Sequence, residues 1–170
     1  MRAEVGAEVK LHPLVLDVGN PLSVQAAVSH MRRHFDQRLD CLVNNAGVNT
    51  LGWSQRSWDT EYAVNFWGPV QLATMLVPHM KPGGRIVNVT SCLGQIESEG
   101  SQWGGVPDSP AYKGAITGAR TLQQLNAIGF HANDIWAATD ARCGRLPCPV
   151  YKYTKAMLNK ATTILARDPK

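Results

Sequence analysis

Three short apolar runs alternate with amphipathic segments along this chain, and this alternation constrains the fold more than any other feature of the sequence. The runs cover residues 13–18, 40–45 and 85–90. Each is long enough for one β-strand, and each is apolar enough to be buried on both faces, which is typical of parallel sheets. The order strand, helix, strand, helix, strand therefore predicts an α/β fold with a parallel sheet.

The segments between the runs carry the signals of helices. Asn20 and Pro21 suit the N-cap and first position of a helix, and apolar residues recur at helical spacing after them. A longer helix is predicted over residues 59–80, because apolar side chains line one face and a Pro-Gly-Gly sequence ends it. Pro69 lies inside this helix and has no N–H for the carbonyl of Asn65, which predicts either a kink or a carbonyl free to bind water.

The region from residue 94 to residue 149 interrupts the alternation. It is rich in Gly, Ala, Ser and Pro and offers only short helices, such as residues 121–128. A connection of this length inside a compact domain is usually a functional insertion or a disordered segment. Helical spacing returns over residues 151–167. We therefore expect one domain over residues 1–170, with an insertion at about 94–149.

Composition narrows the class of protein further. Hydrophobic residues make up 44% of the chain, which suits a packed core, and no apolar run reaches the roughly 18 residues of a membrane span. No signal peptide is recognisable. The four cysteines form no CxxC pair and the histidines are dispersed, so we expect no metal site and a cytoplasmic protein with reduced thiols. The net charge of +4 comes without a basic stripe and does not predict nucleic-acid binding.

The strongest chemical signal is the pair Tyr151 and Lys155. Residues four apart on a helix share one face, so the phenol and the ammonium group are expected side by side. A free phenol, with a pKa near ~10, exchanges protons poorly at neutral pH. A neighbouring cation favours the phenolate, which brings such a group toward the range of general acid–base catalysis. The same spacing also occurs on surface helices whose lysine is only solvated.

Polar motifs end the other predicted elements. They are Asp17-Val18 after the first run, Asn44-Asn45-Ala46-Gly47 after the second, Asn88-Val89-Thr90-Ser91 after the third, and Asn65-Phe66-Trp67-Gly68 in the long helix. Ligands of open α/β sheets bind beyond the carboxyl ends of the strands, where three of these motifs are expected. Each residue also has a structural alternative: Asp17 as a helix cap, the asparagines as partners of backbone groups, and Ser91 as a turn residue.

Together with Tyr151 and Lys155 these make five motifs. In their order along the chain they resemble the motifs of the short-chain dehydrogenase/reductase family, and the resemblance extends from Asp17 to Lys155. It implies a Rossmann-type, doubly wound parallel sheet. It also implies NAD(P)H-dependent reduction of a carbonyl to an alcohol, or the reverse reaction, on a small-molecule substrate.

The resemblance also assigns roles to individual residues. The catalytic set would be Ser91 for orienting the carbonyl, Tyr151 for the proton, Lys155 for the nicotinamide ribose and for tuning the tyrosine, and Asn65 for holding a proton-relay water. The cofactor would be bound by Asp17 and Val18 at the adenine, by Asn45, Ala46 and Gly47 at the adenosine ribose, and by Tyr151 and Lys155.

The spacing of two of these residues points to one branch of the family. Tyr151 lies 60 residues after Ser91, far more than in most members, and a long insertion here resembles the monomeric carbonyl reductases and their plant relatives. In that branch the insertion covers the helix that other members use to form oligomers. The resemblance therefore implies a monomer, and it favours NADP(H) over NAD(H).

The chain departs from the family at its beginning and at its end. No Gly-rich T-G-x-x-x-G-x-G turn precedes Asp17, and the C-terminal strands of the family are absent. The predicted strands correspond to family strands 3, 4 and 5, and without strands 1 and 2 a gap of about 14 Å would separate the first from the second. We therefore expect an incomplete sheet in a chain truncated at both ends. The alternative to an active reductase is a catalytically inactive fragment or pseudoenzyme that acts, if at all, as an interaction module.

Overall fold

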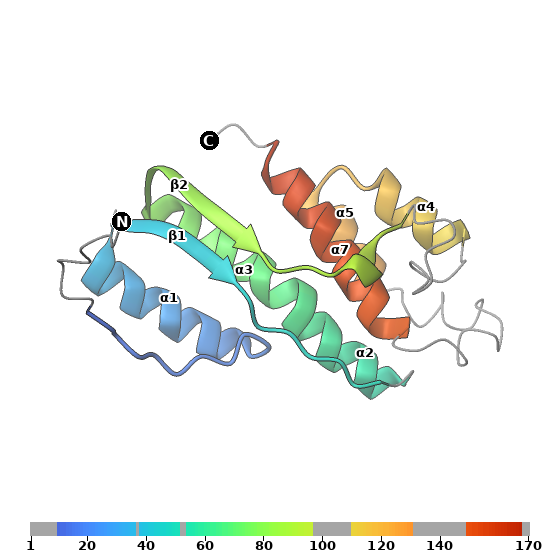
Figure 1. Cartoon of the computed structure of the whole chain (residues 1–170), viewed down its shortest axis with the longest axis horizontal. Helices are drawn as coiled ribbons and strands as arrows, with labels where there is room; N and C mark the ends of the chain where they lie inside the picture. Colours follow the sequence, from blue (N-terminus) through green and yellow to red (C-terminus); the bar gives the residue numbers. More distant parts are fainter. Residues whose placement is uncertain (1–9, 37, 52–53, 97–109, 131–148, 168–170) are drawn as a thin grey trace, which may run out of the picture.

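The computed structural model describes residues 10–36, 38–51, 54–96, 110–130 and 149–167. In chain order the elements are α1 (Pro21–Phe35), β1 (Leu39–Asn44), α2 (Gln55–Tyr62), a π-helical turn η1 (Ala63–Trp67), α3 (Gly68–Leu76), a 3₁₀ turn η2 (Val77–His79), β2 (Met80–Asn88), a 3₁₀ turn η3 (Cys92–Gly94), α4 (Pro110–Gly118), α5 (Leu122–Phe130) and α7 (Pro149–Leu165). Helix α3 packs against α1 on one side and against α7 on the other, α7 lies beyond the carboxyl ends of the strands, and α4 and α5 lie against α7 (Figure 1).

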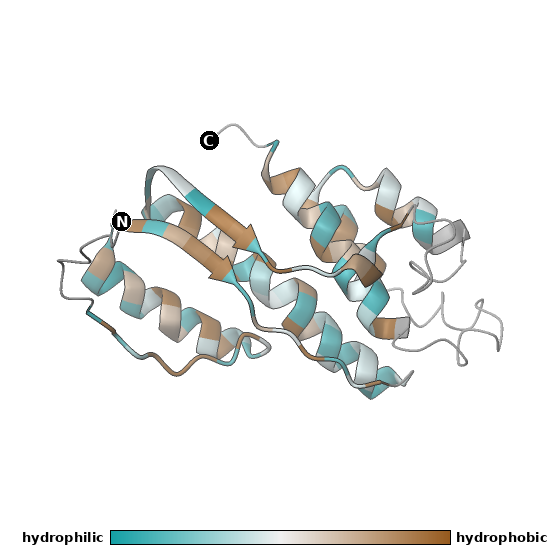
Figure 2. Cartoon of the chain, viewed as in Figure 1, coloured by the Kyte–Doolittle hydropathy of each residue, from teal (hydrophilic) through white to brown (hydrophobic). Residues whose placement is uncertain are grey.

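Strands β1 and β2 form a parallel pair, as predicted. Leu42 pairs with Ile86, and Asn44 pairs with Asn88 at the carboxyl ends. Both strands are apolar mainly toward their carboxyl ends, whereas the first part of β2 is hydrophilic or neutral (Figure 2). The architecture is therefore the expected α/β type with an incomplete sheet.

The strand predicted at residues 13–18 is not formed, so that prediction is wrong. The segment has no ladder partner among the described residues, and Val15 is 94% exposed. A groove of about 340 Å³ separates Leu14 and Leu16 from Leu42 of β1. Because a strand exists only through hydrogen bonds to a neighbour, an apolar run that faces a groove stays extended without becoming part of the sheet.

Helix α1 begins where predicted. The Asn20 side chain accepts a hydrogen bond from the backbone N–H of Leu22 at 2.9 Å, which caps the helix. Val24 and Val28 of α1 pack against Leu72 of α3 in the smaller of two apolar clusters. This cluster holds the α1 side of the molecule together.

The long predicted helix is divided into several parts. Instead of one helix over residues 59–80, α2 and α3 flank the π-helical turn, in which the N–H of Gly68 donates to the carbonyl of Ala63 five residues earlier. Pro69, which lacks an N–H, follows directly. A Cβ on Gly68 would lie only 2.4 Å from the carbonyl oxygen of Val18. The glycine therefore allows α3 to approach the segment before α1.

The insertion contributes two short helices to the larger apolar cluster. The helix predicted at residues 121–128 is present as α5, and its Leu125 packs with Ile116 of α4 against Met157 of α7. Within the described part of the chain no helix is long and apolar enough to cross a membrane. The same residues contain no group of three His, Cys, Asp or Glu that could hold a metal ion.

Candidate active site

The carboxyl ends of the two strands are tied to α7 by side-chain amides. Asn44 Nδ2 donates to Asn88 Oδ1 at 2.8 Å, and Asn88 Nδ2 donates to Thr162 Oγ1 at 2.8 Å. Asn44 and Asn88 are also paired in the sheet register. These bonds fix the position of α7 against the end of the sheet, where the family resemblance places the site.

Lys155 reaches from α7 to the end of β2. Its ammonium donates to the carbonyl oxygen of Val89 at 2.8 Å and lies 5.7 Å from the centre of the Tyr151 ring. The two side chains therefore share one face of the helix, as predicted. Lys155 is only 3% exposed, and the loss of hydration lowers the pKa of its ammonium below the usual value.

Asn65 holds the loop that follows β1. Its Oδ1 accepts from the N–H of Val48 and its Nδ2 donates to the carbonyl of Val48, both at 2.8 Å. Nδ2 also lies 3.2 Å from Thr154 Oγ1 on α7. Because this amide is fully buried and both of its N–H donors and one lone pair of its oxygen are engaged, its side chain positions the loop and α7.

Gly47 lies between Asn65 and Lys155. A Cβ built on Gly47 would be 3.4 Å from Asn65 Oδ1 and 3.5 Å from Lys155 Nζ. The absence of a side chain thus leaves the backbone of the Asn-Asn-Ala-Gly motif open directly beside the lysine.

Ser91 begins the 3₁₀ turn that packs on α7. Its Oγ accepts from the N–H of Leu93 at 3.1 Å, which closes the turn that follows Ser91. A Cβ on Gly94 would lie 2.7 Å from the carbonyl carbon of Lys155, which shows how closely the turn approaches α7. The structure therefore brings Gly94, three residues after Ser91, against Lys155, which lies one helical turn after Tyr151.

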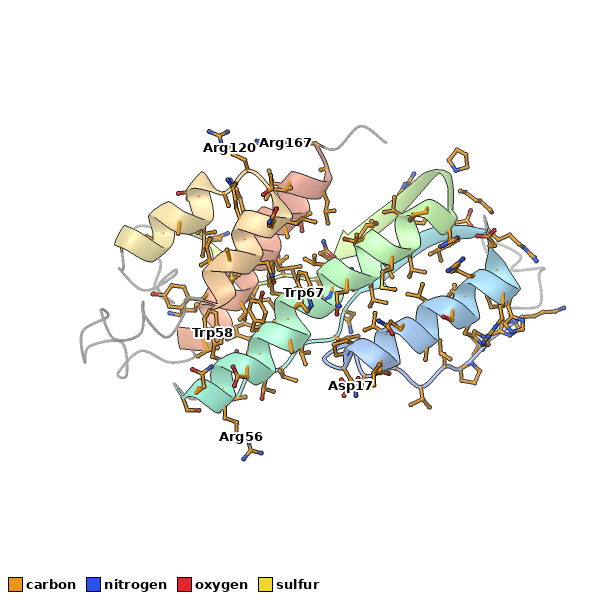
Figure 3. The ribbon with its side chains drawn as sticks, turned by 180° about the vertical axis from the view of Figure 1, so that it is seen from behind. Asp17, Arg56, Trp58, Trp67, Arg120 and Arg167 are labelled. Atoms are coloured by element: carbon orange, nitrogen blue, oxygen red, sulfur yellow. The ribbon has the colours of Figure 1, made fainter. Side chains whose placement is uncertain are left out.

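The remaining predicted cofactor residues lie farther along the same side. Val18, Asn45 and Ala46 line the groove of about 340 Å³ between the segment before α1 and β1. Asp17 is exposed at the start of α1 (Figure 3), and its Oδ1 accepts from the N–H of Gly19 at 2.9 Å. Asp17 thus closes a turn before the helix, whose cap is Asn20, and no described contact joins it to Lys155.

Several residues of the site were missed in the sequence. Thr154 and Gly94 make close contacts with Asn65 and α7, and Glu61 is buried one helical turn before Asn65. An acidic residue four positions before Asn65, on the face of a helix expected to be buried, was the available signal for Glu61. Nothing local distinguishes Gly94, because its contact depends on how α7 folds back.

Comparison with known proteins supports the assignment of the fold. A model of the family described as short chain dehydrogenase matches residues 1–103. The solved structure of menthone neomenthol reductase from Mentha piperita superposes on 89% of this chain and 64% of its own, with a TM-score of 0.66 and 23% sequence identity. The class defined by the fold and by the strand ends is thus the Rossmann-type α/β protein.

Two curated relatives narrow this class. The chain is 27% identical over 181 residues to (+)-neomenthol dehydrogenase of Arabidopsis thaliana, covering 89% of this chain and 58% of the relative. It is 37% identical over 83 residues to carbonyl reductase [NADPH] 3 of Rattus norvegicus, covering 46% of this chain and 30% of the relative. The chain belongs to the short-chain dehydrogenase/reductase family, and it spans between 30% and 58% of the length of these relatives.

Proposed function

We propose that this chain forms the catalytic part of an NADPH-dependent carbonyl reductase, which reduces the carbonyl of a small molecule to an alcohol or runs the reverse reaction. The main support for the proposal is that three other segments of the chain contact Lys155. Gly47 lies beside its ammonium, Val89 accepts its hydrogen bond, and Gly94 packs on its backbone. NADPH is favoured over NADH because one relative is named for NADPH.

The residues around Lys155 and those of the groove suit the two ribose groups of a dinucleotide. An ammonium group has three donors, and the described part of the chain engages one of them, on Val89. The others are available to ribose hydroxyls beside Gly47, with Tyr151 on the same helix face. Val18 and Ala46 of the groove would hold the adenosine end, with Asn45 beside them. We propose that Asp17 contributes at its rim. The cofactor would supply the hydride, and the protein its placement.

The chain's own residues would handle the proton. Ser91 Oγ uses a lone pair on the N–H of Leu93, so its hydrogen remains able to bond the substrate oxygen. The Tyr151 hydroxyl would donate its proton to that oxygen as the carbonyl becomes an alcohol. The Lys155 cation near the Tyr151 ring would stabilise the phenolate left behind.

Asn65 would act through its main chain in this scheme. Its side-chain amide is engaged by Val48 and Thr154. Because Pro69 has no N–H, the usual helical donor to the Asn65 carbonyl is absent. We propose that this carbonyl holds the water that returns a proton to Tyr151. If Pro69→Ala left both the helix geometry and the turnover unchanged, this part of the proposal would be wrong.

The decisive test uses the protein at its natural length. Its intact mass is measured first, and NADPH oxidation is then followed with aromatic ketones, quinones and terpenoid ketones. Lys155→Met is compared with Lys160→Met, since both lysines lie on α7 and donate to a backbone carbonyl, Lys160 to Thr117 at 2.7 Å. We expect a loss of about 10²-fold or more in kcat for Lys155→Met and for Tyr151→Phe, and none for Lys160→Met. A natural mass of 18.6 kDa without turnover would instead favour the inactive-fragment hypothesis.

We also propose that the protein is a cytoplasmic monomer. Helices α4 and α5 cover α7 through Ile116 and Leu125, which pack against Met157. This face of α7 is therefore closed to a second copy. Light scattering of the natural-length protein tests the oligomeric state, and cell fractionation tests the location.

A further inference from the structure

Glu61 of α2 is a buried acid that the proposed chemistry does not use. Its side chain is 1% exposed. Oε1 accepts from the N–H of Thr50 at 2.7 Å and from the Thr50 hydroxyl at 2.6 Å. Oε2 is inaccessible and has no hydrogen-bond partner within the described part of the chain. Burial of a carboxyl group with one unpaired oxygen lowers the stability of the fold, so a compensating structural or functional role is expected for Glu61.

The contacts of Glu61 continue those of Asn65. The two residues are four apart on one helix face, which separates them by about 6 Å along the axis. Val48 and Thr50 are two residues apart, which corresponds to about 6.6 Å where the backbone is extended. Asn65 bonds the backbone of Val48 on both sides, and Glu61 bonds Thr50 twice. The two helical side chains therefore bind the loop as a neighbouring strand would, with matching spacing.

The loop held in this way contains one strained residue. Leu51 has a φ of 55°, in the left-handed region that is unfavourable for leucine. Its N–H donates to the Asn49 side chain at 3.0 Å. Such a conformation persists only where the surroundings over-determine it. The two bonds from Thr50 to Glu61 lie directly before this residue and supply that constraint.

The other end of the loop reaches the proposed cofactor site. Gly47 lies beside Lys155, with a built Cβ 3.5 Å from its ammonium, and Val48 follows directly. We propose that Glu61 is a positioning residue, which fixes residues 45–51 through Thr50 and so places Gly47 beside Lys155. Its effect on cofactor binding rests on the proposed function.

The chemistry of the contact predicts which substitutions it tolerates. Burial raises the pKa of Glu61, and this effect is larger than the opposing effect of the bonds from Thr50. Both of those bonds end on Oε1, so a neutral acid or an amide can accept them equally well. Glutamine should therefore replace Glu61, whereas leucine should leave the N–H of Thr50 unpaired.

The experiment compares Glu61→Gln, Glu61→Leu and Asp59→Leu in the natural-length protein. Asp59 is a matched control, because it lies on the same helix but is exposed. Within the described part of the chain, its side chain accepts a hydrogen bond only from Gln55. Residue-resolved amide exchange is measured at Thr50 and Val48, and KM for NADPH and kcat are measured separately.

We expect Glu61→Leu to speed exchange at Thr50 about tenfold or more, the size of one lost buried hydrogen bond, and to raise KM for NADPH by a similar factor with less effect on kcat. In the exchange rate at Thr50 and in KM for NADPH, Glu61→Gln and Asp59→Leu should match the wild type. Unchanged exchange in Glu61→Leu, or a Glu61→Gln variant that behaves like Glu61→Leu, overturns the proposal. Faster exchange without a change in KM overturns only the link between Glu61 and cofactor binding. A protein that never turns over NADPH refutes the proposed function, and the exchange rates still decide whether Glu61 positions the loop. If Glu61→Leu does not fold, Thr50→Val decides, since it removes only the hydroxyl bond and should speed exchange at residues 49–51.

Discussion

Replacing Gly68 with alanine tests how closely the long helix must approach the segment before α1. Gly68 has helical backbone angles, with φ −57°, so a side chain adds no backbone strain. The new Cβ would lie 2.4 Å from the Val18 carbonyl oxygen and 3.1 Å from that of Ala63. The first distance is about 1 Å shorter than two nonbonded heavy atoms prefer. Both neighbours are backbone atoms, which cannot be relieved by a change of rotamer.

The expected change in the free energy of unfolding is the sum of two opposing contributions. Overpacking at a tight backbone contact destabilises by about 1–3 kcal/mol, and alanine gains about 1 kcal/mol over glycine within a helix. Because the overlap is large and the neighbours are rigid, we expect a net loss near 1–2 kcal/mol. For a chain of this size that lowers Tm by about 2–8 °C. Thermal unfolding followed by circular dichroism measures it.

Gly114 provides the matched control for this change. It lies in α4, and a Cβ built on it meets no atom of the described residues within 4 Å. Gly114→Ala should therefore gain only the helical preference and raise stability by about 0.5–1 kcal/mol. The same chemical substitution is thus expected to act with opposite signs at the two sites. A Gly68→Ala protein as stable as the wild type would refute the packing argument.

Because burial raises the pKa of Glu61 above its ordinary value of 4.5, its protonated form stabilises the fold at low pH and this contribution is lost as pH rises through the raised pKa. Urea denaturation should therefore show Glu61→Gln gaining stability relative to wild type as the pH rises above 4.5, and a constant difference would contradict this. Gly94→Ala places a Cβ 2.7 Å from the Lys155 carbonyl carbon and should displace the Ser91 turn, lowering kcat of the natural-length protein about tenfold; equal kcat would show that the turn can yield. The 170-residue chain alone exposes apolar Leu14 and Val15 beside a groove, so it should bind a hydrophobic dye and melt broadly, whereas a sharp cooperative melt without dye binding would be the contrary result.

The sequence was sufficient for those features that depend on local preference and on motif. The strand at residues 40–45, the start of α1 at Pro21 and the helix that carries Tyr151 and Lys155 were all predictable from patterns within a few residues. Each rests on side-chain alternation, capping or helical spacing, which neighbouring residues specify together. The five ordered motifs sufficed for the family for the same reason, since motifs are read without knowledge of contacts.

Tertiary structure alone decided the features that depend on distant partners. Residues 13–18 have the composition of a strand, yet they do not pair with β1 in the described structure, because a strand needs hydrogen bonds that only another segment supplies. Likewise the pattern of residues 59–80 does not reveal that Gly68 meets Val18, or that a π-helical turn precedes it. Local preference therefore determined where the helices begin and which runs are candidates for strands. Long-range contacts determined which candidate strands pair and which residues Lys155, Asn65 and Glu61 meet, since those contacts exist only once the chain has folded back on itself.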